Sequence, residues 1–270
     1  MKIALVNLCK AEDFAQHKYY SDSMSYLREE GINYVDFASK TDTVDLMVEK
    51  FHQALDSDAK VIWVIRGGLS CIRTLDKIDW DKVSKSNKKF YGLSDFTHFS
   101  TMAVSKGLIC FYGQGLTKIK QYFPTKNHRK FITNLLKTGK PFSREAKSIF
   151  LSQSGLNISD VKVIGGHLLI FSFMQGQLKI PLNNRYVFIE YHHSATGEGL
   201  NELGYYLDQL LFLLKDNMPK GFILGRTELK DYNNTLIQIG EINKFYVEKL
   251  SKYKLPVYYL DHFENTITFS

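Results

Sequence analysis

The sequence has few cysteines and no long apolar run. Its three cysteines, Cys9, Cys71 and Cys110, are an odd number at wide spacings without a CxxC pair, so we expect reduced thiols that only pack, and neither a disulfide framework nor a zinc finger. No stretch approaches the ~20 apolar residues that a membrane helix needs. The apolar run within residues 1–7 is too short for a signal-peptide core, which favours a buried strand and a cytoplasmic location.

Motifs for metals and nucleotides are also absent. The sequence contains no HExxH, no P-loop and no GxGxxG, so nothing specific indicates a metal or nucleotide site. We find no internal repeat and no low-complexity segment.

The composition is that of a globular protein. Of 270 residues, 44% are hydrophobic and 23% charged, which suits one large domain or two modest ones. The net charge of +7 permits anionic partners, nucleic acid included. The densest basic region, residues 126–147, mixes its lysines with Pro, Thr, Asn and Gly. A solvated linker surface is the simpler interpretation of it, and a basic rim that attracts anionic ligands is the alternative.

Strand and helix patterns alternate in the first half of the chain. We predict strands at 2–7, 60–65, 89–93 and 108–112, and helices at 41–57, 79–85 and 94–106. The run at 60–65 is rich in β-branched residues, as in a strand buried on both faces of a parallel sheet. This alternation predicts a parallel α/β layer.

The pattern breaks between about residues 120 and 160, where polar and basic residues surround two prolines. Shorter runs then resume at 161–164, 168–173, 186–189, 222–224 and 257–260, with helices near 200–215 and 235–250. We therefore predict an α/β protein with a parallel N-terminal domain at 1–120, a linker at 121–160, and a smaller C-terminal α/β domain with a mixed sheet at 161–270. The active site is expected to draw on both domains.

Ser94 stands between a predicted strand and a predicted helix. A serine at such a turn exposes its hydroxyl, and the next backbone N–H lies at a helix N-terminus where donors are free. The arrangement suits an attacking oxygen beside an oxyanion site. However, Phe96 breaks the G-x-S-x-G pattern of α/β-hydrolases. A helix N-cap formed by Ser94 and Asp95 is therefore the simpler local interpretation.

Arg66, Gly67 and Gly68 directly follow the most apolar predicted strand. Two glycines there permit close backbone approach, at the sheet edge where ligands bind. A tight turn without function is the alternative.

Taken together, these segments resemble the LD-carboxypeptidase family, which includes muramoyltetrapeptide carboxypeptidase and the microcin C immunity peptidases. Its members read roughly W-x-x-R-G-G-Y-G, R-L-L and G-Y-S-D-x-T, then G-G-N-L, F-I-E, a strand with a glycine, and a closing histidine segment. The matching residues here, in the same order, are Trp63–Gly68, Arg73–Leu75, Tyr91–Thr97, Gly165–Leu168, Phe188–Glu190, Leu224–Arg226 and Pro256–His262.

The resemblance implies a catalytic triad. Ser94 would attack the scissile carbonyl, His262 would act as general base, and Glu190 would orient the imidazole. The backbone N–H groups of Gly68 and Asp95 would form the oxyanion hole, and Arg66 with Gly67 would contact the substrate. Glu190 and His262 each follow a predicted strand, so both are expected at strand ends. The neighbouring His192 has no role that the sequence supports.

Several positions depart from the family pattern. The usual Pro-Ser turn after the first strand is replaced by residues 7–10, a His-Gly-Pro-like turn by residues 111–114, and the Asn of G-G-N-L by His167. These changes leave the implied triad intact but indicate a divergent member.

The implied activity is release of a terminal D-alanine from murein tetrapeptide during cell-wall recycling, without a metal or organic cofactor. The expected partner is thus a small peptide, with no nucleic acid and no membrane, and a homodimer is possible. Three alternatives remain: a peptidase that cleaves a peptide–nucleotide antibiotic, a non-catalytic peptide-binding descendant, and a nucleic-acid binder supported by charge alone.

Overall fold

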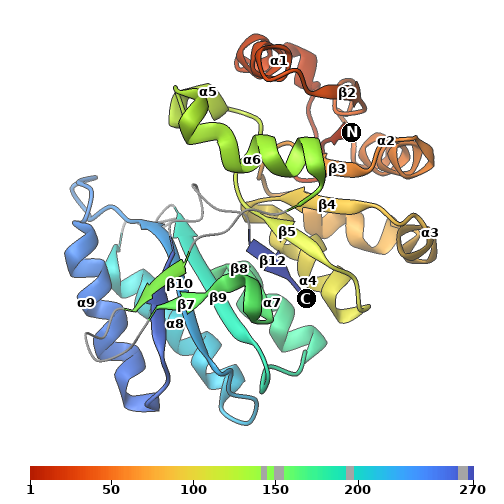
Figure 1. Ribbon diagram of the computed structural model, residues 1–270. Helices are drawn as coiled ribbons and strands as arrows, with labels where there is room; N and C mark the ends of the chain where they lie inside the picture. Colours follow the sequence, from red (N-terminus) through yellow and green to blue (C-terminus); the bar gives the residue numbers. More distant parts are fainter. Residues whose placement is uncertain (141–144, 149–154, 193–197, 261–266) are drawn as a thin grey trace. The chain divides into compact units, whose positions relative to one another are not determined.

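The computed structural model describes residues 1–140, 145–148, 155–192, 198–260 and 267–270. The chain divides into two compact units (Figure 1), the first comprising Met1–Ser143 with Phe263–Ser270 and the second Arg144–His262. Each unit is an α/β structure built on its own strands, so the predicted fold class is confirmed. Among the described residues, no helix is long and apolar enough to cross a membrane.

The first unit is built on parallel strands in the order β2-β1-β3-β4-β5. Their bounds are β1 Lys2–Val6, β2 Asn33–Asp36, β3 Val61–Val64, β4 Lys89–Gly92 and β5 Cys110–Tyr112. The sequence does not predict β12, Ile267–Phe269, which pairs antiparallel with β5 and brings the end of the chain back to this unit. Parallel pairing places the carboxyl ends of β1, β3, β4 and β5 at one edge of the sheet.

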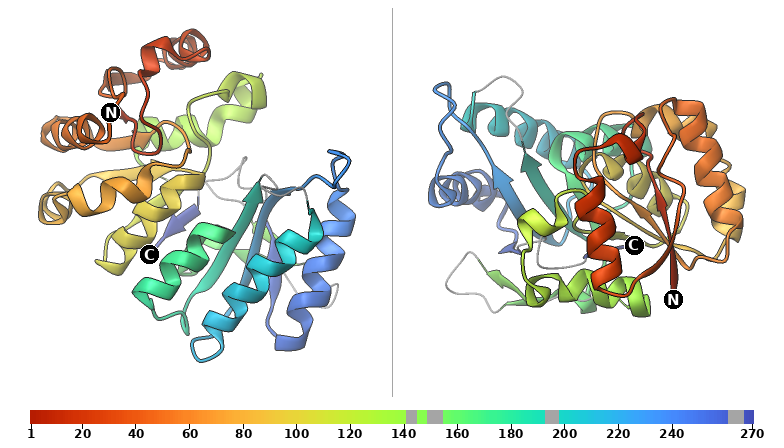
Figure 2. Two further views of the ribbon diagram at one scale, coloured as in Figure 1. Left: turned by 180° about the vertical axis from the view of Figure 1, so that it is seen from behind. Right: turned by 90° about the horizontal axis from the view of Figure 1, so that it is seen from above.

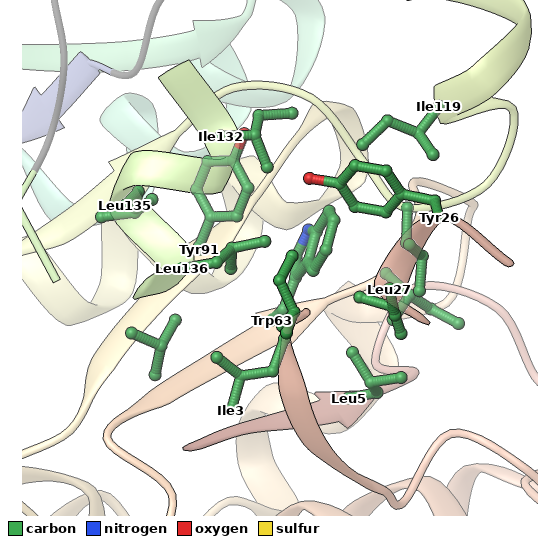
Figure 3. Packing of buried hydrophobic residues seen from close by; sticks show 14 of the residues in the cluster. Ile3, Leu5, Tyr26, Leu27, Trp63, Tyr91, Ile119, Ile132, Leu135 and Leu136 are labelled. Atoms are coloured by element: carbon green, nitrogen blue, oxygen red, sulfur yellow. The ribbon is translucent and has the colours of Figure 1, made fainter. Parts of the chain in front are cut away.

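Helices cover both faces of this sheet. Their bounds are α1 Tyr20–Glu29, α2 Val44–Asp56, α3 Trp80–Lys85, α4 Thr97–Ser105, α5 Ile119–Tyr122 and α6 Lys126–Thr138, with 3-10 turns η1 Phe14–Gln16, η2 Cys71–Lys77 and η3 Ser94–Phe96. Figure 3 shows the core on one face, where Trp63 of β3 packs among residues from the strands, α1, α5 and α6. On the other face Phe90 of β4 lies against Phe51 of α2 and Phe99 of α4.

The second unit has a mixed sheet in the order β8-β9-β10-β11-β6-β7. Strands β8 Val163–His167, β9 Tyr186–His192, β10 Gly221–Glu228 and β11 Val257–Tyr259 are parallel. Strand β6 Glu145–Ser148 pairs antiparallel with β11, and β7 Leu156–Asn157 pairs antiparallel with β6. Helices α7 Leu168–Leu178, α8 Leu200–Leu214 and α9 Ile239–Leu250 lie on one face of this sheet (Figure 2), and 3-10 turns η4 Ile158–Asp160 and η5 Ser251–Tyr253 complete the unit.

Helix α6 and the end of β9 also differ from the sequence prediction. The predicted linker contains helix α6, because Ile132, Leu135 and Leu136 recur at helical spacing and are fully buried although basic residues surround them. Glu190 does not end its strand: β9 continues to His192, since β10 pairs with it as far as Glu228↔His192. The domain boundaries themselves stay a prediction.

Candidate active site

Ser94 lies at a sharp turn between β4 and α4. Its backbone is left-handed, with φ of 54°, a conformation that costs a non-glycine residue free energy and is concentrated at functional sites. Two hydrogen bonds hold the turn: the Ser94 N–H donates to Tyr112 Oη at 2.6 Å, and Thr97 Oγ1 donates to the Ser94 carbonyl at 2.6 Å. The Ser94 side chain is half-buried. The fold therefore fixes the backbone from which the hydroxyl projects.

The loop after β3 lies directly against Ser94. A Cβ added at Gly67 would come within 2.8 Å of Ser94 Cβ and 3.1 Å of Ser94 Oγ. A Cβ at Gly68 would come within 1.9 Å of the Cys9 carbonyl, which accepts hydrogen bonds from the next two N–H groups of the loop. Both glycines are thus required by close approach, and the tight-turn interpretation accounts for Gly68 but leaves the contact between Gly67 and Ser94 to be explained.

Asp95 links this turn to a second segment. Its side chain is 2% exposed; one carboxylate oxygen accepts the Cys71 N–H at 2.9 Å, and the other lies 2.9 Å from His98 Nδ1. Neither η3 nor α4 has a side-chain N-cap hydrogen bond. The predicted N-cap role of Ser94 and Asp95 is therefore wrong, because the Asp95 carboxylate bonds η2 and His98 instead.

The backbone beside Ser94 leaves two donors available. Among the described residues, neither the Gly68 N–H nor the Asp95 N–H has a hydrogen-bond acceptor. The Asp95 nitrogen lies 3.6 Å from the position that a Cβ at Gly67 would occupy. A hydroxyl near free backbone donors is an arrangement that can stabilise an oxyanion during attack on a carbonyl.

Arg66 is anchored by an acidic side chain that the sequence analysis missed. Its guanidinium pairs with Glu12 and donates from Nε to the Gly67 carbonyl at 3.2 Å, and Lys10 also approaches Glu12 at 3.2 Å. Arg66 is half-buried, so the pair fixes the guanidinium beside the glycine loop, and together with Lys10 the group carries one net positive charge. Tyr112, whose hydroxyl oxygen accepts the Ser94 N–H, was missed too. Its position at the end of a predicted strand is a signal that could have identified it.

In the second unit, Glu190 lies inside β9 with no exposed surface, opposite His167 at the end of β8. Its Oε2 is 2.7 Å from Nε2 of His192. Burial lowers the pKa of His192, but the charge and hydrogen bond of Glu190 outweigh this effect and the pKa is raised. His192 therefore has a partner that the sequence analysis overlooked, and the signal was its i+2 spacing from Glu190 in a strand, which places both side chains on one face.

The remaining predicted residue, His262, lies outside the described residues. The three cysteines are buried and free, as the sequence predicts. Among the residues that the structure describes, no group of three or more His, Cys, Asp or Glu side chains could hold a metal ion.

Comparison with known proteins bears on this site. Residues 3–113 match the family described as the LD-carboxypeptidase N-terminal domain. No curated protein sequence matches the chain.

Several solved structures share the fold. A muramoyltetrapeptide carboxypeptidase from Oxalobacter formigenes is similar with a TM-score of 0.76 at 20% identity, over 100% of this chain and 92% of that chain. The microcin C7 self-immunity protein MccF in complex with aspartyl sulfamoyl adenosine has a TM-score of 0.76 at 19% identity, over 99% and 90%. An MccF-like protein from Streptococcus pneumoniae in complex with AMP has a TM-score of 0.71 at 17% identity, over 100% and 94%.

Proposed function

Because residues 3–113 of this chain belong to the LD-carboxypeptidase family, we propose that it is a serine carboxypeptidase that hydrolyses an amide between an L-configured centre and a terminal D-amino acid. The match confirms the family inferred from the motifs and supports a peptidase in general. The proposed substrate is a murein tetrapeptide, from which the enzyme releases D-alanine in cell-wall recycling. A cytoplasmic location and a homodimer remain predictions.

The geometry at Ser94 carries this proposal. The residue has φ of 54° at a strand-to-helix turn, and the Gly67 backbone lies against its side chain. Left-handed backbone at a serine persists only where the surrounding structure enforces it, and here the Tyr112 and Thr97 hydrogen bonds supply that constraint. Serine peptidases and hydrolases use such a turn to expose a nucleophile.

In the proposed mechanism, Ser94 Oγ attacks the scissile carbonyl while His262 accepts the hydroxyl proton. The Gly68 and Asp95 N–H groups stabilise the oxyanion of the tetrahedral intermediate. His262 then protonates the departing D-alanine amine, leaving an acyl-enzyme that water hydrolyses by the reverse sequence. Glu190 orients His262 and stabilises its imidazolium form.

The charge near the glycine loop supports an anionic substrate. Murein tetrapeptides carry several carboxylates, and the chain has a net charge of +7, which favours their approach. We propose that Arg66 and the Gly67 backbone contact the peptide. The Glu12 and Gly67 contacts of Arg66 restrict its side chain, which lowers the entropy lost when a ligand binds.

Replacement of the nucleophile tests the proposal. Purified protein is incubated with murein tetrapeptide, and mass spectrometry measures the tripeptide and D-alanine. We expect release that falls by at least about 10³-fold in Ser94→Ala, as in other triad enzymes. Ser105→Ala is the matched control, since Ser105 is exposed near the end of α4 and is expected to retain full activity. Equal rates in wild type and Ser94→Ala would contradict the proposed nucleophile.

The alternative substrate is an aminoacyl nucleotide. It is favoured by the likeness to the microcin C7 self-immunity protein, whose structure holds aspartyl sulfamoyl adenosine. The same assay with aspartyl sulfamoyl adenosine separates the two, because kcat/KM for each compound can be compared directly. Binding of either compound without turnover would instead indicate a non-catalytic descendant.

A further inference from the structure

His192 contacts the carboxylate of Glu190 from the same strand. The two side chains point to one face of β9 because they are two residues apart, and Nε2 lies 2.7 Å from Oε2. The Glu190 side chain has no exposed surface, and that of His192 is 13% exposed. An ionised carboxylate accepts hydrogen bonds but cannot donate one, so Nε2 must carry the hydrogen in this contact.

Charged groups of the neighbouring strands also face His192. Glu228 of β10 is its register partner, and Arg226 of the same strand pairs with Glu228 at 2.5 Å. His167, at the end of β8, lies with Nε2 3.4 Å from the His192 carbonyl. Two carboxylates and one guanidinium therefore influence the imidazole of His192, and Glu190 is the group in direct contact.

We propose that His192 is a positioning residue that fixes the Glu190 carboxylate through Oε2, so that its other oxygen serves the general base. This inference rests on the proposed function, in which Glu190 orients His262. The 2.7 Å contact with His192 holds one oxygen of this buried carboxylate in place. A hydrogen bond donated to the ionised form also favours that form, and His192 lies outside the three residues proposed for the triad.

The pair also tunes the charge that Glu190 presents. When His192 is protonated, its positive charge offsets part of the carboxylate charge. Glu190 then stabilises the imidazolium form of the general base, His262, less strongly. The pKa of the general base is then lower than it would be beside an isolated carboxylate, so the base stays unprotonated at lower pH. Removal of the His192 charge should therefore move the acid limb of kcat/KM to higher pH.

Two substitutions separate positioning from simple packing. His192→Gln retains an N–H donor near the position of Nε2 but cannot become charged, whereas His192→Ala removes both. We expect His192→Gln to shift the acid limb upward while kcat at its plateau falls less than 10-fold. His192→Ala should lower kcat by about 10²-fold, the loss that an ångström of misplacement causes. His52→Gln, which lies in α2 of the first unit, is the matched control and should leave the profile unchanged.

A titration provides a readout that does not need turnover. The imidazole of His192 is followed by NMR against pH in wild type and in Glu190→Gln. Because the carboxylate raises the pKa of His192, the substitution should lower it. A pKa that rises in the folded protein contributes stability that is fully present below the unfolded value near 6.5 and is lost as pH rises through the folded value, so wild type should exceed His192→Gln in stability most at acidic pH.

The outcomes distinguish this inference from the proposed function. An unchanged acid limb in His192→Gln, or a His192 pKa that does not respond to Glu190→Gln, would overturn the positioning role while Ser94-dependent release still stood. The other outcome is that the His192 pKa responds to Glu190→Gln, but the wild-type protein neither releases D-alanine nor cleaves aspartyl sulfamoyl adenosine. That result would overturn the proposed function, and the positioning role with it.

Discussion

At the scale of single residues, the site requires a residue without a side chain at position 67, because the Gly67 backbone lies against Ser94. Gly67→Ala would place a methyl group 2.8 Å from Ser94 Cβ, closer than such atoms approach, so the loop or the serine turn must move. Overpacking of this kind costs about 1–3 kcal/mol. We expect a lower melting temperature and a loss of activity of about 10²-fold, because the shift displaces the reacting oxygen. Thermal unfolding and D-alanine release measure both effects.

Gly240→Ala is the control for this substitution. Gly240 lies in α9, and a Cβ there would meet nothing within 4 Å. Alanine favours a helix over glycine by up to about 1 kcal/mol, so this variant should be as stable as wild type or more so and fully active. If Gly67→Ala behaved like Gly240→Ala, the contact between the glycine loop and Ser94 would not matter for catalysis.

The sequence predicts residues at this scale unevenly. Arg66, Gly67 and Ser94 are identifiable because they follow apolar strands whose carboxyl ends meet at one edge of the sheet. Glu12 is not, since it becomes relevant only through Arg66, a partner distant in the chain. The strand-end position of Tyr112 is a signal, but it does not indicate that this side chain contacts Ser94.

At the scale of elements, Asp95 ties together η2, η3 and α4. Its buried carboxylate accepts the Cys71 N–H at the start of η2 and contacts His98 of α4. In Asp95→Asn only one side-chain oxygen remains, so one of the two contacts must be lost or reversed. Leaving a buried polar group unsatisfied costs about 1–3 kcal/mol. We therefore expect a reduced free energy of unfolding in urea and a parallel fall in activity, because the Asp95 N–H is part of the same turn.

Asp81→Asn is the control for this variant. Asp81 is exposed in the first turn of α3, and its substitution should change the free energy of unfolding by no more than about 0.5 kcal/mol. Equal stability of Asp95→Asn and Asp81→Asn would show that the link between η2 and the serine turn contributes nothing.

Elements differ in how far the sequence determines them. Strands β1, β3, β4 and β5 were predicted because each is a short apolar run between turn signals. Helix α6 was missed because its basic residues mask the buried positions, and α7 because the run at 168–173 is too short to distinguish helix from strand. In both cases packing decides the element, as it does when tertiary contacts override local preference.

At the scale of the whole molecule, the end of the chain completes the unit that contains Ser94. Strand β12 pairs antiparallel with β5, and this pairing links residues about 155 positions apart, as between Ile267 and Tyr112. A three-residue strand after a long gap carries no local signal strong enough to predict such a pairing. The predicted domain boundaries rest on contiguity along the chain, which gives no indication of such a pairing.

This long-range pairing leads to a prediction for Phe269. Its ring is fully buried and stacks on Tyr112 with centroids 5.1 Å apart, and Tyr112 accepts the Ser94 N–H. Phe269→Ala should lower the free energy of unfolding by about 3–5 kcal/mol and reduce activity beyond what unfolding explains, since Tyr112 loses the packing that holds it beneath the serine turn. Urea denaturation and kcat at a temperature where the variant is fully folded measure the two effects.

Phe212→Ala is the matched control, because Phe212 is 70% exposed on α8 and should change stability by no more than about 0.5 kcal/mol. A stable Phe269→Ala variant would mean that β12 does not support the first unit in solution, and full activity in a destabilised one would mean that Tyr112 holds Ser94 without it.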